Sequence, residues 1–257
     1  MRERYHADTT QQTETPVRLN KYLAQSGICS RREADRLIEK GKVLVDGQTA
    51  QAGLKVLSGQ KITVDGRLVK REEQRILLAF YKPRGVVCTT DNRWGDTTVA
   101  DILQYPKRVF YVGRLDKDSE GLLLMTNDGD LQNAIMKAAN YHEKEYQVGV
   151  DAPIGETFIK KMASGVFLKE LDVTTRPCRI RRTGKAKFTI ILTQGLNRQI
   201  RRMCEACGRK VIHLKRVRVM NITLDGLTPG QYRMVTPEEV RQLESMLKKN
   251  GSLQKWR

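Results

Sequence analysis

A short charged segment separates this sequence into two blocks, and we interpret it as a linker between two domains. Residues 69–75 contain the run Lys70-Arg71-Glu72-Glu73, whereas apolar residues recur on both sides of it. The first block has about fifty residues and the second well over a hundred, which suits two separate domains. The sequence therefore predicts a disordered polar tail over residues 1–16, a small domain over 17–68, a linker over 69–75 and a larger domain over 76–250.

The first block has the pattern of two short helices followed by a small sheet. Apolar residues between positions 19 and 28 predict a helix that Gly27 ends. Ser30 followed by Glu33 predicts a capping box at the start of a second helix, which continues to about Lys40 and ends at Gly41. Strands are expected at residues 43–47 and 62–66, and each segment closes with Asp-Gly, a signal for a tight hairpin turn.

Basic residues gather on the second of these helices. Arg32, Arg36 and Lys40 are four residues apart on one face, where like charges destabilise an isolated helix by a few tenths of a kcal/mol per pair. We interpret this face as a stripe that contacts phosphates, with an ordinary solvent-exposed face as the alternative. The whole chain favours the first interpretation, since 47 Lys and Arg residues against 29 Asp and Glu give a net charge of +18. Such self-repulsion usually accompanies a polyanionic partner, most often nucleic acid.

The second block favours strands interrupted by single helices. An apolar run from Ile76 to Phe80 is stopped by Pro83. Further strands are expected at residues 86–89, 109–112, 122–126, 145–150, 178–182, 188–193 and 217–222. Helices are expected at residues 98–103, 131–138, 154–164, 197–207 and 237–248. Because strands and helices do not alternate steadily, we predict an α+β fold with a mostly antiparallel mixed sheet.

A polar loop with three acidic residues lies between two of the apolar runs. It reads Gly-Arg-Leu-Asp-Lys-Asp-Ser-Glu-Gly over residues 113–121, and Leu-Leu-Leu-Met-Thr follows it. Loops held by a rigid sheet commonly carry catalytic groups. An ordinary turn rich in Asp and Gly has the same composition, so the spacing alone leaves both interpretations open.

Several segments carry more specific motifs. Residues 113–129 read G-R-L-D-x-x-S-x-G-L-L-L-x-T-N-D-G, residues 142–146 read H-E-K-E-Y, and residues 194–203 read Q-G-L-N-R-Q-I-R-R-M. Together they resemble the RsuA-type family of ribosomal RNA pseudouridine synthases, and the details are most similar to its F-type large-subunit (23S) enzyme. Residues 81–85 resemble the family's N-K-P-x-G motif, with Tyr81 in place of Asn. In the first block, R-L-N-K-Y-L (residues 18–23) and S-R-R-E-A-D (residues 30–35) resemble the S4 RNA-binding module.

The resemblance implies a small S4-like α/β module followed by a catalytic domain that converts uridine to pseudouridine. It assigns Asp116 as the nucleophile, which would either attack the nucleoside or remove its 2′ proton. It assigns Tyr146 as the aromatic residue that stacks on the uracil, although a tyrosine in a strand is often plain core.

The resemblance further assigns Arg201 as the cation that keeps the Asp116 carboxylate charged, since a carboxylate in a dry pocket tends to bind a proton. A helical projection of residues 197–207 supports this assignment. It places Arg201 beside the apolar stripe of Ile200, Met203, Cys204 and Cys207, and it turns Arg198 and Arg202 away from that stripe.

RNA contacts are expected in both blocks. The resemblance places them around the catalytic loop and the third motif, and on the basic helices of the first block; a surface position is the alternative for each arginine and lysine. Lys82 and Arg84 are further candidates for phosphate contacts, and a structural or RNA-contacting role is expected for His142. The full set of expected RNA-binding residues is Gly113, Arg114, Leu115, Asn197, Arg198, Gln199, Ile200, Arg18, Lys21, Arg31, Arg32, Arg36 and Lys40.

No cofactor and no metal are expected. The isomerisation loses no atom and involves no redox change. Cys204 and Cys207 form one Cys-x-x-Cys pair, whereas zinc sites need four ligands. We expect a monomer that acts on ribosomal RNA (23S in particular), with transfer RNA as a further substrate to consider.

The compartment and the competing functions complete the expectations. No run of about 18 apolar residues predicts a membrane span, and the polar N-terminus lacks the apolar centre of a signal peptide. Five scattered cysteines suggest reduced thiols and the cytoplasm. One alternative function is a non-catalytic S4-containing RNA-binding protein that acts in ribosome assembly. The other is an RNA methyltransferase, but no G-x-G-x-x-G follows a strand.

Overall fold

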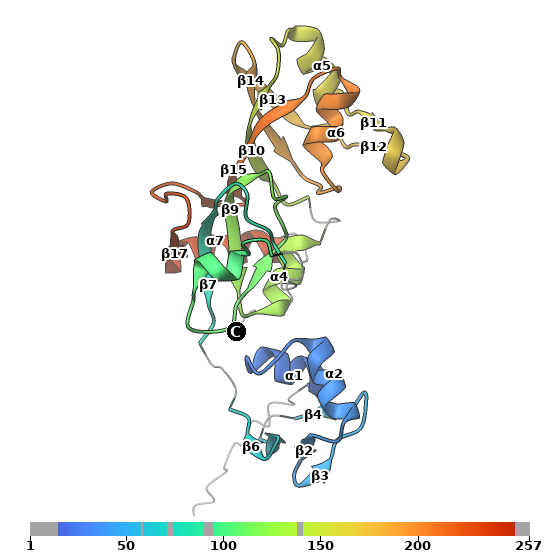
Figure 1. Cartoon of the computed structure of the whole chain (residues 1–257), viewed down its shortest axis with the longest axis vertical. Coiled ribbons are helices and arrows are strands. Elements are labelled where there is room, and N and C mark those ends of the chain that lie inside the picture. Colours follow the sequence, from blue (N-terminus) through green and yellow to red (C-terminus); the bar gives the residue numbers. More distant parts are fainter. Residues whose placement is uncertain (1–14, 58, 71–73, 90–94, 138–140, 250–257) are drawn as a thin grey trace, which may run out of the picture. The chain divides into compact units, whose positions relative to one another are not determined.

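The computed structural model describes residues 15–57, 59–70, 74–89, 95–137 and 141–249. The chain forms two compact units, Met1–Gln74 and Arg75–Arg257, which are shown in Figure 1. The expected disordered tail over residues 1–16 lies outside the described residues except for its last two positions, and so do residues 71–73 of the expected linker. None of the helices in the described ranges combines the length and apolar character needed to cross a bilayer.

The N-terminal unit contains two helices and a small antiparallel sheet, as expected. Leu19, Leu23, Ala34 and Ile38 are its buried helical residues. The Asp-Gly turns are confirmed, since Asp46 and Asp65 both have positive φ, as tight hairpins of this kind require. The elements are α1 (Leu19–Gln25), α2 (Arg31–Glu39), a four-stranded sheet in the order β3 (Gln48–Thr49), β2 (Val43–Val45), β5 (Ile62–Val64) and β6 (Arg67–Leu68), and a separate pair β1 (Val17–Arg18) and β4 (Lys55–Val56).

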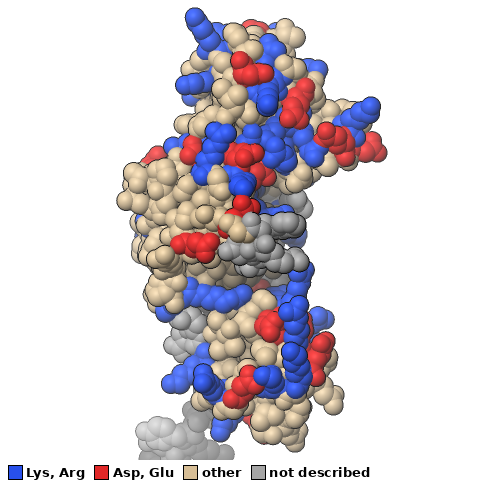
Figure 2. Space-filling view, in the orientation of Figure 1, with Lys and Arg blue, Asp and Glu red and all other residues tan. Residues whose placement is uncertain are grey.

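The capping box expected at α2 forms only in part. Ser30 accepts a hydrogen bond from the backbone N–H of Glu33 at 3.2 Å, but the Glu33 carboxylate instead forms an ion pair with Arg36 at 3.1 Å. Arg32, Arg36 and Lys40 are all exposed. Over this unit, Figure 2 shows lysine and arginine side chains interspersed with acidic ones. The α2 face is therefore basic but not free of acidic neighbours.

The C-terminal unit is built on one large sheet, as predicted. Its strand order is β13-β14-β10-β15-β9-β7-β17, with β16 paired to β15 and β8 paired to β9. Every pairing is antiparallel except that of β15 with β9. The strand bounds are β7 (Leu77–Lys82), β8 (Phe110–Val112), β9 (Glu120–Thr126), β10 (Lys144–Val150), β13 (Arg179–Gly184), β14 (Lys187–Leu192), β15 (Val211–Val219), β16 (Ile222–Thr223) and β17 (Tyr232–Met234).

Helices cover the two ends of this sheet over separate cores. Figure 1 shows α4 and α7 beside the β7–β9 end, and α5 and α6 beside β13 and β14. Buried leucines of β9, α4 and α7 form one core, while Phe158, Met162, Phe188 and Ile200 belong to the other. The helices are α3 (Val99–Leu103), α4 (Gly129–Met136), α5 (Glu156–Ser164), α6 (Gln199–Ala206) and α7 (Pro237–Lys249), and β11 (Phe167–Leu168) pairs with β12 (Val173–Thr174).

Two expected strands differ from the structure. Residues 86–89 form no strand, and Val87 only makes an isolated bridge to Thr98. The strand expected at 217–222 is the end of the longer β15, followed by a turn and β16. Met220 has φ of 52° in this turn, so the chain reverses where the apolar pattern suggested a continuous strand. The second difference arises from a turn that hydrophobic periodicity does not record.

Gly121 allows the parallel pair β9–β15 to form. Its φ is 108°, and a Cβ atom at this position would lie 2.2 Å from the carbonyl oxygen of Arg216. No side chain fits so close to backbone, so only glycine permits this approach. The pairing matters for function because β9 begins directly after the polar loop, and Glu120 and Gly121 are its two residues in register with β15.

Candidate active site

The polar loop connects β8 to β9 and presents Asp116 at its turn. The backbone N–H of Ser119 donates to the carbonyl of Asp116 at 3.0 Å, which closes the turn. The Asp116 side chain keeps 33% of its surface exposed. Leu115, the preceding residue, is buried. The turn and the buried Leu115 therefore fix the backbone of the loop, while the Asp116 carboxylate remains accessible.

A buried lysine fixes the end of this loop. Lys82, at the end of β7, is fully buried and donates from Nζ to the carbonyl of Ser119 at 2.7 Å and to that of Pro83 at 2.8 Å. Burial lowers the pKa of Lys82 to about 8, although nearby acidic groups, Asp116 among them, act in the opposite direction. The phosphate contact considered for Lys82 is wrong, because its ammonium lies inside the protein.

Arg201 lies behind the same loop. As the helical projection predicted, it points inward and is only 7% exposed. Its guanidinium donates to the carbonyl of Asp118 at 3.1 Å, to Ser119 Oγ at 3.3 Å and to the carbonyl of Val211 at 3.2 Å. These bonds join α6, β15 and the loop, so Arg201 positions the backbone that carries Asp116.

The ion-pair partner of Asp116 is a different arginine. Arg198 Nη1 lies 3.6 Å from Asp116 Oδ2, and among the described residues no ion pair joins Asp116 to Arg201. The helical projection turned Arg198 away from the apolar stripe, and Arg198 is indeed exposed, but its pairing with Asp116 was not predicted. Arg198 has φ of 51° and precedes the first helical residue of α6, so a helical projection does not apply to it.

Asp116 opens into a cavity of about 500 Å³. Tyr146, on β10 of the same sheet, lines the same cavity, so the two residues expected to attack and to stack on a nucleoside come together. Seven residues expected to contact RNA also line it: Gly113, Arg114, Leu115, Asn197, Arg198, Gln199 and Ile200. Gln199 and Ile200 are buried in its wall. The remaining expected RNA contacts, Arg18, Lys21, Arg31, Arg32, Arg36 and Lys40, belong to the N-terminal unit.

A β-bulge places Arg216 and Arg218 of β15 on opposite faces of the sheet, although residues two apart in a regular strand share one face. Glu145 pairs with Arg218, but the next residue of β10, Tyr146, pairs with Arg216, so one residue of β15 is left over. Such an insertion reverses the alternation of side chains. Arg216 consequently lines the cavity, while Arg218 forms ion pairs with Glu143 at 3.0 Å and Glu145 at 2.9 Å.

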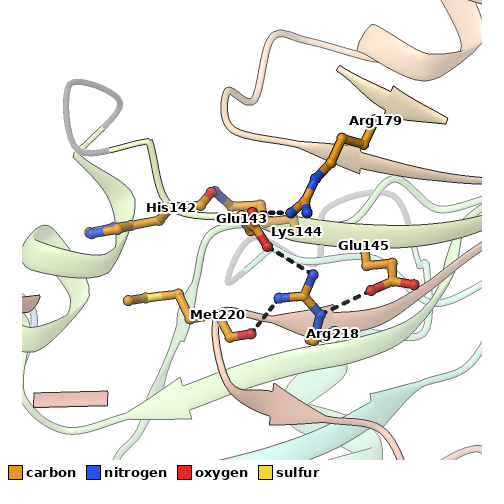
Figure 3. Close-up of polar contacts among 7 residues, drawn as sticks. All are labelled: His142, Glu143, Lys144, Glu145, Arg179, Arg218 and Met220. Atoms are coloured by element: carbon orange, nitrogen blue, oxygen red, sulfur yellow. Dashed lines mark hydrogen bonds and ion pairs between the residues drawn. The ribbon is translucent and has the colours of Figure 1, made fainter. Parts of the chain in front are cut away.

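The H-E-K-E-Y segment uses both faces of the same sheet. Figure 3 shows Arg218 between Glu143 and Glu145, with Arg179 on the other side of Glu143. Lys144 and Tyr146 alternate with these acids and line the cavity. His142 is buried, and its Nδ1 lies 2.9 Å from the carbonyl of Ile135, which is a structural role.

Three basic residues of the cavity, Lys117, Lys144 and Arg216, were missed by the sequence analysis. Lys144 is two residues before Tyr146 and therefore lies on the same face of the strand, which is a signal that the motif itself contains. Arg216 could not have been found, because its direction depends on the bulge. The departure at Tyr81 is accommodated in the core, where the Lys215 ammonium lies 4.8 Å from the centre of its ring.

Comparison with known proteins agrees with this geometry. The sequence pattern of the RNA pseudouridylate synthase family matches residues 76–206, and that of the S4 domain matches residues 17–62. This chain belongs to the RNA pseudouridylate synthase family. Its family membership favours the catalytic interpretation over a non-catalytic RNA-binding protein. The catalytic loop, Tyr146 and the start of α6 all lie inside the matched segment.

Individual relatives of this pseudouridylate synthase family member cover most of the chain. The dual-specificity RNA pseudouridine synthase RluF of Salmonella typhi is 46% identical over 242 residues, 93% of this chain and 83% of that protein. The ribosomal large subunit pseudouridine synthase B of Bacillus subtilis is 37% identical, over 89% of this chain and 96% of that protein. A crystal structure of a pseudouridylate synthase is 28% identical with a TM-score of 0.66, covering 88% of this chain and 99% of that one.

Proposed function

We propose that this protein isomerises a specific uridine of ribosomal RNA to pseudouridine, with Asp116 as the nucleophile. One observation carries the proposal: an accessible carboxylate on an anchored loop shares a cavity of about 500 Å³ with Tyr146. A cavity of this size is within the range that accepts a small organic group. Relatives with names that specify RNA pseudouridine synthases cover most of the chain.

Each cavity residue then has a chemical role. Asp116 attacks the nucleoside or removes its 2′ proton, and Tyr146 stacks on the uracil once it has left the RNA helix. Arg114 and Arg198, both exposed at this cavity, contact the RNA backbone around the extruded nucleotide. Arg201 is a positioning residue, because it contacts the loop and not the carboxylate.

In this proposal the substrate is large-subunit (23S) ribosomal RNA. The protein acts on it as a monomer in the cytoplasm. The name of the Bacillus subtilis relative specifies the large ribosomal subunit, and the name of the Salmonella typhi relative specifies dual specificity. A transfer RNA, raised in the sequence analysis as a further substrate, is the second substrate to test. The reaction rearranges one nucleoside without loss of atoms, so it requires neither an organic cofactor nor a metal.

Mapping pseudouridine in RNA tests this proposal directly. The 23S, 16S and transfer RNAs of a strain lacking the protein should lack pseudouridine at one or a few positions, and the purified protein should restore it in vitro. An unchanged pseudouridine map in all three RNAs would contradict the proposal. Restoration of pseudouridine in 16S RNA alone would support the proposed reaction but show that the substrate is 16S and not 23S RNA.

The basic face of α2 is expected to contribute to RNA affinity. Substituting Arg32, Arg36 and Lys40 together by alanine should make the fall of log affinity with log salt less steep, by about 2 to 3 in slope. Each phosphate that is no longer contacted keeps its bound counterions, so fewer ions are released on binding. Filter binding at several salt concentrations measures this slope. The matched control replaces three exposed basic residues of the same unit outside α2, Lys55, Lys61 and Arg67. Equal losses in the two variants would show that net charge, not this face, determines binding.

A further inference from the structure

The cavity beside Asp116 contains more positive charge than its one carboxylate can balance. Asp116 is the only acidic residue among the described residues that line it, and it is already paired with Arg198. The basic lining residues are Arg114, Lys117, Lys144, Arg198 and Arg216. Of these, Lys117 is paired with Asp96, so Arg114, Lys144 and Arg216 carry the excess charge. Uncompensated positive charge in a recess indicates that an anionic group occupies it during function.

Burial separates these basic residues into two groups. Arg114, Lys117 and Arg198 are exposed, whereas Lys144 is half-buried and Arg216 is only 4% exposed. Arg216 Nε donates to the carbonyl of Leu122 at 2.7 Å, but its buried Nη2 has no partner among the described residues. A buried donor without a partner is costly, so Arg216 is prepared for an acceptor that the protein itself does not supply.

Both inner cations lie next to Tyr146. Arg216 is its direct cross-strand partner, and such partners have Cβ atoms about 5 Å apart. Lys144 is two residues away on β10 and on the same face, which corresponds to a separation of about 7 Å. Lys144 also donates to the carbonyl of His142 at 3.3 Å, leaving further donors of its ammonium group available. A base stacked on Tyr146 would thus have a lysine and an arginine at its edge.

The proposed reaction generates negative charge on that base. When the bond between C1′ and N1 breaks heterolytically, both bonding electrons remain on the uracil, which becomes an anion with charge shared by O2 and O4. C1′ is left electron-deficient, as an oxocarbenium ion or as an ester of Asp116. After the base turns, C5 uses an electron pair to bond to C1′, and where the ester had formed its C1′–O bond breaks and returns the electron pair to the Asp116 carboxylate. The C5 proton is then lost and N1 gains a proton, so the product is an isomer with no net change in atoms or electrons.

We propose that Lys144 and Arg216 bind the carbonyl oxygens of the detached, negatively charged uracil and act as catalytic residues. This inference rests on the proposed function, because only a reaction that detaches the base creates this anion. Preorganised donors at developing charge stabilise a transition state more than the ground state. The exposed Arg114, Lys117 and Arg198 are better suited to RNA phosphates, which remain near solvent.

Removing the Lys144 charge tests the inference. Lys144→Met should lower the single-turnover rate constant at saturating enzyme by about 10²- to 10³-fold, the range seen for loss of one oxyanion donor. The Kd for RNA and its salt dependence should change less than twofold. Lys144→Arg should recover a large part of the rate. The matched control is Lys215→Met, which removes the same charge from β15 where the ammonium lies over the Tyr81 ring; its rate should match that of the wild type.

The pH profile provides a readout that a structural role would not move. Burial, and next the positive charge of Arg216, lower the pKa of Lys144 to about 8. Since the protonated lysine is the active form, the wild-type rate constant should fall as pH rises through about 8. Lys144→Arg should shift this fall to higher pH, because arginine stays protonated. The charged and titratable groups in the cavity, on the strand of Lys144 and in the two residues before it are Cys88, Arg114, Asp116, Lys117, Arg198, Arg216, His142, Glu143, Glu145 and Tyr146.

Each outcome decides the inference. A wild-type rate constant in Lys144→Met overturns it. A raised Kd with the salt slope reduced by about one and the maximal rate retained would identify a phosphate contact instead, and would also overturn it. If Lys144→Met does not fold, an unshifted pH profile in Lys144→Arg overturns the inference. Activity retained in Asp116→Asn would refute the proposed function itself. Loss of activity in Asp116→Asn together with full activity in Lys144→Met would refute only this inference.

Discussion

Asp116→Asn is expected to abolish pseudouridine formation, by at least about 10⁴-fold, while RNA binding is retained. Asparagine keeps the shape of the side chain but cannot act as a nucleophile or as a base. The loop should not move, because its anchors are backbone carbonyls of Asp118 and Ser119 and the hydroxyl of Ser119. Affinity should be equal or higher, since the change removes the one negative charge of a cavity that faces a polyanion.

The measurement is pseudouridine yield in the RNA under single-turnover conditions, with Kd determined on the same RNA. The matched control is Asp118→Asn, two residues away on the same loop. Its side chain is exposed, and its contact with Arg201 is made by the carbonyl oxygen, so its activity should be close to that of the wild type. Product from Asp116→Asn at more than a few per cent of the normal rate would contradict the assigned role and favour a non-catalytic function for this carboxylate.

The sequence allowed the fold and most of the cavity wall to be predicted. Asp-Gly turns, a serine N-cap and the apolar run before Pro83 are local signals, and the structure confirms each. The catalytic loop was recognisable from its motif, and Tyr146 reaches the cavity with it. What these features share is dependence on residues close together in the sequence.

The features that sequence could not supply depend on pairing between distant segments. The bulge opposite Glu145 and Tyr146 turns Arg216 into the cavity and Arg218 out of it, and no periodicity within β15 reveals an insertion relative to β10. Lys82 was considered a candidate for a phosphate contact, yet β7 is buried along its whole length. The continuous apolar run before Lys82 is the signal of a strand covered on both faces, and it could have indicated a buried lysine.

Arg198 and Arg201, two of the three arginines of the third motif, show what a helical projection can and cannot predict. The projection correctly turned Arg201 inward, because Arg201 lies within α6. It could not predict that Arg198 pairs with Asp116, since Arg198 adopts a left-handed conformation before the helix begins. A left-handed non-glycine residue is costly and is found more often at functional sites, which agrees with its place beside Asp116.

Arg201→Ala is expected to lower the rate constant by about 10²-fold or more, because displacement of a reacting group by about 1 Å can have this effect. The substitution removes three hydrogen bonds that join α6, β15 and the catalytic loop. It also leaves buried acceptors unpaired, at a cost of about 1–3 kcal/mol each in stability. Lysine is not expected to replace Arg201, since a single ammonium lacks the planar fork that reaches separated acceptors.

Arg198→Ala supplies the contrast that separates positioning from charge pairing. Its ion pair with Asp116 spans 3.6 Å, and the Arg198 side chain is 41% exposed. Exposed ion pairs contribute at most about 1 kcal/mol, so the rate constant should fall no more than about tenfold. Both variants are compared by single-turnover rate and by thermal unfolding. A larger loss in Arg198→Ala than in Arg201→Ala would show that the charge beside the carboxylate, and not the anchoring of its loop, sustains the reaction.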